Sequence, residues 1–284
     1  MKYIKANRFT TEFLRETIMG PNPAKLLEQV LDKYPVNEGS LVLDLGCGKG
    51  VTSLLLALEY RMRVFATDLW IEPSENWERF RSFGLGAEQI VPIHAEAHDL
   101  PYANEFFDAI FCIDSYQYFG CDPNYLGEHL LPLVKHGGRL LFVVPGMKKD
   151  LHGNLPPEML LSWRAEDIDT LHDRAYWQKT LEATEGVEIE SIYELEDFDE
   201  CWNEWLATDN EYAVHDRLSM NAGAGKYMNL LAIALKRKYR AYMQKRFRFS
   251  PEAFYIRSVL FLFGSGGFFR QFERDDLARE QARK

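Results

Sequence analysis

The sequence predicts an α/β fold: a doubly wound, mostly parallel sheet of seven strands with an antiparallel edge. Three observations support this prediction. Short apolar runs typical of buried strands alternate with longer amphipathic runs typical of helices. A glycine-rich turn follows the first of these strands and opens the next helix. Two late strand-like runs close one edge of the sheet, which suits an antiparallel ending.

An N-terminal helical segment (residues 1–35) is expected before the sheet begins. It holds a helix over residues 3–18, then a turn in which Asn22 is an N-cap and Pro23 the first position of a helix that runs to about Lys33. We then expect strands over residues 41–46, 63–69, 89–97, 106–115 and 137–146. Helices are expected over residues 51–60, 74–84 and 126–134. This alternation implies right-handed crossovers and a sheet covered on both faces.

The pattern changes after Gly146. Residues 147–182 are polar and contain tryptophan, and residues 165–184 have a helix-like pattern. We expect residues 147–182 to form a lid insertion above the sheet. The remaining elements are expected to be strands over 187–197 and 226–238, with helix and loop over 199–220.

Net charge divides the chain near residue 238. Residues 239–284 carry ten Lys or Arg and five Asp or Glu, which leaves 23 basic and 38 acidic residues in 1–238. We therefore expect a main domain over 1–238 and a basic, aromatic C-terminal extension over 239–284. The extension is predicted to pack on the domain or to form a homodimer contact rather than to bind a membrane. Its longest apolar run, residues 259–269, is too short and too rich in glycine to span a bilayer.

Composition narrows the class of protein. The formal net charge of −10, without a broad basic surplus, disfavours nucleic acid as a partner. The four cysteines lie scattered, without the spacing of metal ligands, so we expect reduced thiols, a cytoplasmic location and no metal site. The N-terminal residues lack the apolar run of a signal peptide.

The stretch VLDLGCGKG (residues 42–50) predicts a ligand that lies against bare backbone. A dinucleotide site has the pattern G-x-G-x-x-G. Here the glycines are Gly46, Gly48 and Gly50, so the third comes one position early. Asp44 beside this loop would repel a pyrophosphate and favours a ligand with an ammonium or sulfonium group.

These residues resemble the first motif of the class I S-adenosylmethionine-dependent methyltransferases. The resemblance implies S-adenosyl-L-methionine as cofactor, with Asp44 near its methionine end and Gly46, Gly48 and Gly50 at its backbone wall. It implies a Rossmann-like fold and, in overall layout, a likeness to the ubiquinone/menaquinone-biosynthesis and cyclopropane fatty acid synthase groups.

Further motifs carry the same resemblance. Asp68 ends the second strand, where an acid in this family accepts the ribose hydroxyls, and Leu69 follows it. The run IHAEAHDLPYANEFFDAIFC resembles the family pattern G-D-A-x-x-L-P-F followed by F-D, with Glu96 in place of the aspartate. Ala97 and His98 would then lie near the adenine.

The loop over residues 113–120 corresponds to the acceptor side of the family's pocket. We expect Asp114 to contact the cofactor and to act in catalysis together with Tyr116 and His152; His172 is a further candidate base. The Asn/Asp-Pro-Pro-Tyr motif of nucleic-acid and protein-amide methyltransferases is absent, because the run beginning at Asp122 comes too late and lacks the second proline. The cyclopropane synthases have Phe-Glu-His-Val-Gly where this chain has Tyr-Gln-Tyr-Phe-Gly, so their bicarbonate site is not expected.

The predicted function is therefore methyl transfer to an O or N atom of a small-molecule acceptor, which needs little beyond positioning and removal of a proton. Three alternatives stay open at this point: a cofactor-binding sensor or scaffold without activity, a C-methylation like that of cyclopropane synthases, and an NAD-dependent enzyme. Tryptophans and a tyrosine flank the cofactor motifs and could line a pocket for an apolar or cationic molecule: Trp70, Trp77, Trp163, Tyr176, Trp177, Trp202 and Trp205. We expect residues 1–23 and 147–182 to cover this pocket, with a hinge at Met19–Pro21.

Overall fold

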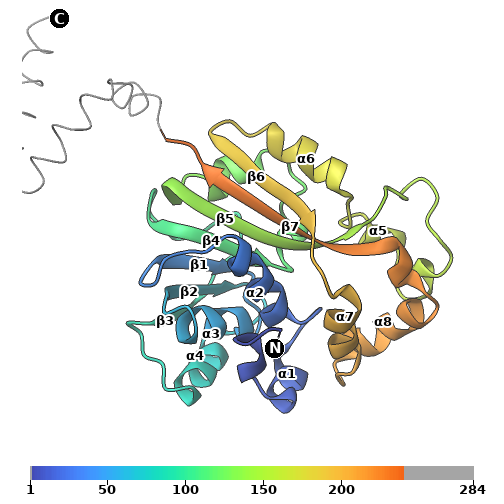
Figure 1. The fold of residues 1–284 in the computed structure, drawn as a ribbon, viewed down its shortest axis with the longest axis horizontal. Coiled ribbons are helices and arrows are strands. Elements are labelled where there is room, and N and C mark those ends of the chain that lie inside the picture. Colours follow the sequence, from blue (N-terminus) through green and yellow to red (C-terminus); the bar gives the residue numbers. More distant parts are fainter. Residues whose placement is uncertain (1, 240–284) are drawn as a thin grey trace, which may run out of the picture. The chain divides into compact units, whose positions relative to one another are not determined.

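The computed structural model describes residues 2–239, which form a seven-stranded sheet with helices on both faces (Figure 1). The strands are β1 Leu41–Leu45, β2 Arg63–Asp68, β3 Ile90–His94, β4 Phe107–Ile113, β5 Val134–Met147, β6 Val187–Glu194 and β7 Met228–Arg237. The α-helices are α1 Thr11–Thr17, α2 Pro23–Lys33, α3 Val51–Leu58, α4 Pro73–Ser82, α5 Ala165–Ile168, α6 Arg174–Glu182, α7 Phe198–Leu206 and α8 Glu211–Asn221. Shorter helical turns are η1 Ala6–Arg8, η2 Tyr116–Tyr118, η3 Leu126–Leu130, η4 Met159–Leu161 and η5 Ala224–Tyr227.

The strand order confirms the predicted doubly wound sheet. It runs β3-β2-β1-β4-β5-β7-β6, and β1 pairs in parallel with both β2 and β4. The last strand, β7, is antiparallel to β5 and to β6, as expected for the closing edge. From β1 the chain adds β2 and β3 toward one edge of the sheet, and then β4 and β5 toward the other edge, so the strand order reverses between β1 and β4. Ligands of doubly wound sheets bind at such a switch point, beyond the carboxyl ends of the strands.

Two apolar cores lie on opposite faces of the sheet. Successive β1 residues alternate between them, with Val42 in one core and Leu43 in the other. The first core contains buried residues of α2, α3, α4 and α7, and the second contains buried residues of α6 and η3. Because both faces are covered, the inner strands β1 and β4 are mostly apolar, and their polar side chains lie toward the strand ends, with Asp108 near the start of β4 and Asp44 near the end of β1.

The predicted helix over residues 3–18 is divided into η1 and α1. Thr10 has an extended backbone (φ −69°, ψ 153°) and its side chain accepts from Phe13 N at 3.2 Å. A threonine that caps a helix start in this way ends any helix before it.

Two other predicted helices also differ. Over residues 126–134 the chain forms the single π-helical turn η3, in which Leu131 N donates to Leu126 O at 2.8 Å, and Pro132 has no N–H to continue a helix. The stretch 165–184 is interrupted where His172 forms a β-bridge with Gly146. Tertiary pairing overrides helical propensity at this point.

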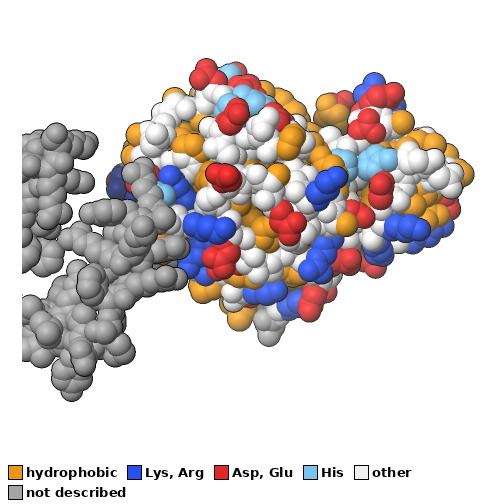
Figure 2. Space-filling view, turned by 90° about the horizontal axis from the view of Figure 1, so that it is seen from above, with side chains coloured by type: hydrophobic (Ala, Val, Ile, Leu, Met, Phe, Trp, Pro, Cys, Tyr) orange, Lys and Arg blue, Asp and Glu red, His pale blue; other side chains and the backbone are white. Residues whose placement is uncertain are grey.

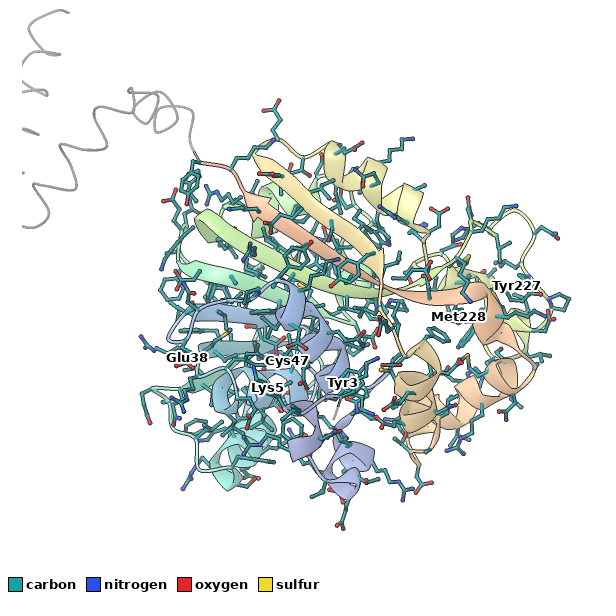
Figure 3. The ribbon with its side chains drawn as sticks, in the orientation of Figure 1. Tyr3, Lys5, Glu38, Cys47, Tyr227 and Met228 are labelled. Atoms are coloured by element: carbon teal, nitrogen blue, oxygen red, sulfur yellow. The ribbon has the colours of Figure 1, made fainter. Side chains whose placement is uncertain are left out.

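The N-terminal segment is fixed to α7 by polar contacts. Asn22 is 1% exposed, and its side chain accepts from Ala24 N and Lys25 N, which caps α2, while it donates to Glu204. The Lys25 ammonium donates to Glu204 at 2.6 Å and to Glu200. Tyr3, labelled in Figure 3, donates to Asp197 at the start of the same helix. These contacts set the position of the loop over residues 18–22.

The chain divides into two units after Lys238. The predicted C-terminal extension, and with it the predicted homodimer contact, lies outside the described residues except for Tyr239. Within residues 2–239 no helix is long and apolar enough to cross a bilayer. On the face drawn in Figure 2 the acidic and basic side chains are interspersed, without a continuous area of one sign.

We predict that Asn22→Ala lowers the free energy of unfolding by about 1–2 kcal/mol, because it removes an N-cap and a hydrogen bond between α2 and α7. Urea denaturation followed by circular dichroism measures the change. Asn210→Ala is the matched control: Asn210 caps α8 by accepting from Tyr212 N but has no bond to a second helix. Equal losses in the two variants would show that the link to Glu204 contributes nothing.

Candidate functional site

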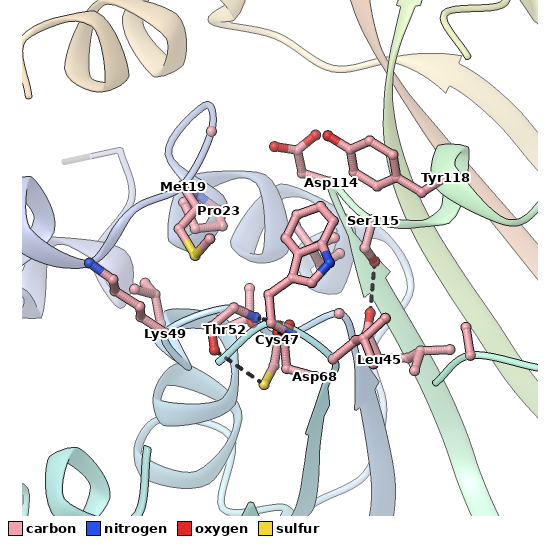
Figure 4. Close-up of a pocket in the computed structure, with 18 of the residues that line it drawn as sticks. Met19, Pro23, Leu45, Cys47, Lys49, Thr52, Asp68, Asp114, Ser115 and Tyr118 are labelled. Carbon is pink, nitrogen blue, oxygen red and sulfur yellow. Dashed lines mark hydrogen bonds between the residues drawn. The ribbon is translucent and has the colours of Figure 1, made fainter. Parts of the chain in front are cut away.

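A cavity of about 300 Å³ opens at the carboxyl ends of β1, β2, β3 and β4 (Figure 4). It lies at the switch point of the sheet, between β1 and β4. Five segments contribute its lining, and these fall within residues 17–23, 45–52, 68–70, 95–98 and 113–119. The cavity is therefore where a doubly wound sheet is expected to hold a ligand.

Two of the three predicted glycines form the wall of this cavity. Gly46 and Gly48 line it with φ of 72° and 53°. A Cβ on Gly46 would lie 2.4 Å from Ser115 Cβ, and one on Gly48 would lie 3.0 Å from Met19 Sδ. Glycine is needed at both positions because the loops after β4 and after α1 pack directly on this backbone.

Gly50 does not line the cavity, and its contact with the cofactor stays a prediction. Its φ is 77°, it stands at the N-cap of α3, and an added Cβ would lie 2.5 Å from the Phe80 ring. This glycine is required by the turn into α3 and by packing against α4.

Asp44 also lies outside the cavity lining, and its position near the methionine end of the cofactor stays a prediction. It is 1% exposed, and its Oδ2 accepts from Thr52 Oγ1 at 2.6 Å and from Ser53 Oγ at 2.5 Å. Burial raises the pKa of Asp44 to about 6, against the lowering effect of these two hydrogen bonds. Its Oδ1 has no hydrogen-bond partner in the described part of the chain. Asp44 thus joins the end of β1 to α3 beneath the glycine loop.

Asp68 lies where the sequence places it, at the end of β2 and in the cavity wall. Its Oδ2 accepts from Gly48 N at 2.7 Å, and its Oδ1 accepts from Trp70 N and Ile71 N at 2.8 and 2.9 Å. The carboxylate therefore fixes the glycine loop to the turn after β2. Leu69, also predicted, lines the cavity beside it.

Glu96, Ala97 and His98 line another part of the cavity, and their contacts with the cofactor stay predictions. The Glu96 carboxylate accepts from the His98 backbone N at 2.7 Å and lies 2.8 Å from His98 Nδ1. The His98 hydrogen bond holds the pKa of Glu96 below its usual value. Tyr125 donates to Ala97 O at 2.9 Å and fixes this turn against η3. Glu96, which is longer than the aspartate of the family pattern, therefore orders its own loop through its contacts with His98.

Asp114 lines the cavity at the end of β4 with a left-handed backbone, φ 61°. Its carboxylate lies over Gly20, where an added Cβ would be 1.9 Å from Oδ2. Burial raises the pKa of Asp114 to about 7; the Gln117 hydrogen bond, 3.2 Å from Nε2 to Oδ1, lowers it and the charge of Asp216 raises it. A carboxyl group with this pKa exchanges protons near neutral pH.

Tyr116 and His152 do not line the cavity, and their catalytic roles stay predictions. Tyr116 is 1% exposed and stacks on Phe142 with ring centroids 4.1 Å apart, in the core beneath the sheet's end. Two residues later, Tyr118 lines the cavity instead. The sequence run Tyr-Gln-Tyr offers both tyrosines, and only the backbone geometry of η2 distinguishes them.

His152 lies in a separate cluster. Its Nδ1 is 2.7 Å from Asp150 Oδ1, and its ring centroid is 5.0 Å from that of His172. Burial lowers the pKa of His172 to about 4, so this ring is neutral at physiological pH. None of residues 147–182 lines the cavity, so the predicted lid role of that insertion is not met at this site. Within the part of the chain that is described, no three metal-ligating side chains gather.

The sequence motifs did not indicate which individual residues of the N-terminal segment line the cavity. Thr17, Met19, Gly20, Pro21 and Pro23 all line the cavity. Trp70, one of the aromatic residues expected at a pocket, lines it as well. The lining residues that were not individually predicted are Leu45, Cys47, Lys49, Val51, Thr52, Ala95, Ile113, Ser115, Tyr118 and Phe119. Ser115 Oγ donates to Leu45 O at 2.7 Å and so ties β4 to the glycine loop.

We predict that Gly46→Ala costs several kcal/mol of unfolding free energy, about 1–2 for the left-handed backbone and about 1–3 for the clash with Ser115. Gly39→Ala is the matched control, since Gly39 has a similar φ of 75° and nothing within 4 Å of an added Cβ. Urea unfolding of both variants separates the two costs. A loss no larger for Gly46→Ala than for Gly39→Ala would mean that the contact with Ser115 imposes no constraint.

Comparison with known proteins identifies the family of the central segment. Residues 43–142 match a family model described as a methyltransferase domain. "Methyltransferase GfsG" of Streptomyces halstedii is 31% identical over 117 residues, which are 41% of this chain and 41% of that protein. The malonyl-[acyl-carrier protein] O-methyltransferase of Herminiimonas arsenicoxydans is 31% identical over 120 residues, 42% of this chain and 41% of that protein. The matches thus span less than half the length of each curated relative.

A solved structure shares the fold over more of the chain. The geranyl diphosphate C-methyltransferase of Streptomyces coelicolor A3(2), solved with Mg²⁺, geranyl diphosphate and S-adenosyl-L-homocysteine, matches with a TM-score of 0.59 and 16% identity, covering 75% of this chain and 77% of that one. At this identity the likeness concerns the fold. Residues 43–142 thus match a methyltransferase domain, and the chain shares the fold of a solved methyltransferase.

Proposed function

We propose that the chain transfers a methyl group from S-adenosyl-L-methionine to an O or N atom of a small-molecule acceptor. The observation that carries this proposal is the wall of bare backbone at Gly46 and Gly48, at the switch point of the sheet, with Asp68 beside it. This wall suits a ligand without phosphate, because the acids around it disfavour a pyrophosphate.

The cavity residues fit such a cofactor. Asp68 uses three acceptor positions on backbone N–H groups, and a carboxylate has about four, so one remains for a ribose hydroxyl. Gly46 and Gly48 would hold the methionine portion, and Leu69 and Ala97 provide apolar contacts for the adenine. Asp44 would act through the glycine loop rather than by contact, since it lies beneath it.

S-adenosylmethionine supplies a methyl group on a positively charged sulfur, so the protein needs only to place the acceptor, exclude water and accept a proton. Asp114 is the base that we propose, because it lines the cavity and has a pKa near 7. Residues 17–23 cover the cavity from the N-terminal side and would limit access of water. The cytoplasmic location expected from the sequence belongs to this proposal, and all four cysteines are free.

The kind of atom that receives the methyl group distinguishes O- or N-methylation from the alternative of C-methylation. The curated relative from Herminiimonas is an O-methyltransferase by name, and the similar structure from Streptomyces coelicolor is a C-methyltransferase. A carbon acceptor is therefore an explicit outcome of a product assay, in which mass spectrometry locates the transferred methyl group. Cofactor binding without transfer to amines, phenols or carboxylates would favour the sensor or scaffold alternative.

We predict stoichiometric binding of S-adenosylhomocysteine in isothermal titration calorimetry. Asp68→Ala should weaken this binding by roughly tenfold or more, because it removes a charged acceptor and releases Gly48 N. Glu75→Ala, at an exposed acid of α4 outside the cavity, is the control and should bind as the parent does. No binding by a well-folded parent protein would refute the proposed function, and binding of NADH in its place would favour the dehydrogenase alternative.

A further inference from the structure

The wall of the cavity beyond Asp68 carries a carboxylate and a phenol, Asp114 and Tyr118. Gln117 lies outside the lining and donates to Asp114, and we call these three residues the acceptor wall. We infer that the acceptor wall binds a cationic amine, whose N–H groups donate to Asp114. This inference rests on the proposed function and narrows its acceptor from O or N compounds to amines.

The acceptor wall has hydrogen-bond acceptors in excess. Among the described residues, Asp114 makes no ion pair with Lys or Arg, and Gln117 is its hydrogen-bond donor. Gln117 is 2% exposed, and its Oε1 has no hydrogen-bond partner within the described part of the chain. The cavity-facing acceptor of this group is therefore the Asp114 carboxylate, which lines the cavity. An ammonium group has up to three N–H donors, whereas an alcohol has one and a carboxylate has none.

A second carboxylate adds negative potential to this wall. Asp216, on α8, accepts from Trp163 Nε1 at 2.7 Å and from Trp205 Nε1 at 2.9 Å. Indole N–H groups are neutral donors, so they orient this carboxylate without cancelling its charge. Its charge acts on both Asp114 and Tyr118. Asp167 on α5 also acts on Tyr118, but it is paired with Arg164 at 2.8 Å.

Aromatic faces complete the arrangement. Trp70 and Tyr118 are 68% and 62% exposed, and their rings meet edge to face with centroids 5.8 Å apart. Exposed faces of this kind attract cations. Figure 4 shows the Asp114 carboxylate and the Tyr118 hydroxyl pointing toward each other, on the side of the cavity away from Lys49. Among the described residues, Lys49 is the one Lys or Arg of the lining, and it donates to Glu16 O at 2.8 Å.

The test measures binding to protein saturated with S-adenosylhomocysteine, using three probes of similar shape: benzylamine, benzyl alcohol and benzoate. Tryptophan fluorescence and calorimetry at pH 8 report the affinities. We expect benzylamine to bind roughly tenfold more tightly than benzyl alcohol, and benzoate to bind more weakly than either. Equal affinity for the amine and the alcohol would overturn the inference while leaving S-adenosylhomocysteine binding, and with it the proposed function, intact.

Asp114→Asn is the decisive variant, because asparagine tolerates the left-handed backbone at this position. It should reduce benzylamine affinity about tenfold and change S-adenosylhomocysteine affinity by less than about twofold. A loss confined to S-adenosylhomocysteine would instead assign Asp114 to the cofactor's own ammonium group and refute the inference. Asp122→Asn, at an exposed acid in the loop after η2 outside the cavity, is the control and should leave both affinities unchanged.

The pH dependence gives an independent readout. Asp114 is protonated below pH 7 and charged above it, so benzylamine affinity should rise between pH 6 and pH 8. The groups that act on this carboxyl are Gln117, which lowers its pKa through a hydrogen bond, and Asp216, whose charge raises it. In Asp114→Asn the rise should disappear. An unchanged rise in that variant would mean that another group governs binding, contrary to the inference.

Discussion

The close packing of two loops on the backbone of Gly46 and Gly48 is the constraint on which the rest of the site depends. Ser115 arrives from the end of β4 and Met19 from the N-terminal segment, and neither leaves space for a Cβ on the glycine it contacts. The Asp68 carboxylate holds the same loop from the side of β2 through Gly48 N. Three strand ends and the N-terminal segment therefore meet at one stretch of bare backbone, and the cavity is the space that they leave between them.

The N-terminal segment can contribute to this site because it is anchored away from it. Asn22 caps α2 and at the same time bonds to α7, so the turn before it is held between two helices. The pairing of Lys25 with Glu200 and Glu204 is partly buried, where removing one partner costs more than at the surface. The loop over residues 18–22 is thus anchored at its Asn22 end, which places Met19, Gly20 and Pro21 in the cavity lining.

The strands, their order of appearance and the cofactor side of the site could be predicted from the sequence because each depends on local signals. Apolar runs marked the strands, and the spacing of Gly46, Gly48 and Asp68 follows from a strand–turn–helix unit. The acceptor side could not be predicted in the same way. Tyr116 and Tyr118 differ in role because η2 turns one into the core and the other toward the cavity. Asp216 acts on Asp114 across about a hundred residues of sequence, and nothing in α8 alone indicates that two indoles hold its carboxylate.

The charges around the cavity give its two ends different chemistry. Near the glycine loop the acids are committed: Asp44 to two hydroxyls of α3 and Asp68 to three backbone N–H groups. These donors are neutral and leave the charge in place, but they occupy acceptor positions of both carboxylates, which thereby position backbone. At the far end Asp114 accepts one amide N–H and Asp216 accepts two indole N–H groups, all neutral donors. Charge that is oriented but not compensated raises the potential that a bound cation experiences, because the cavity walls exclude water. A ligand that brings positive charge to this end gains the most from it, and a phosphate or carboxylate would be repelled by the same groups.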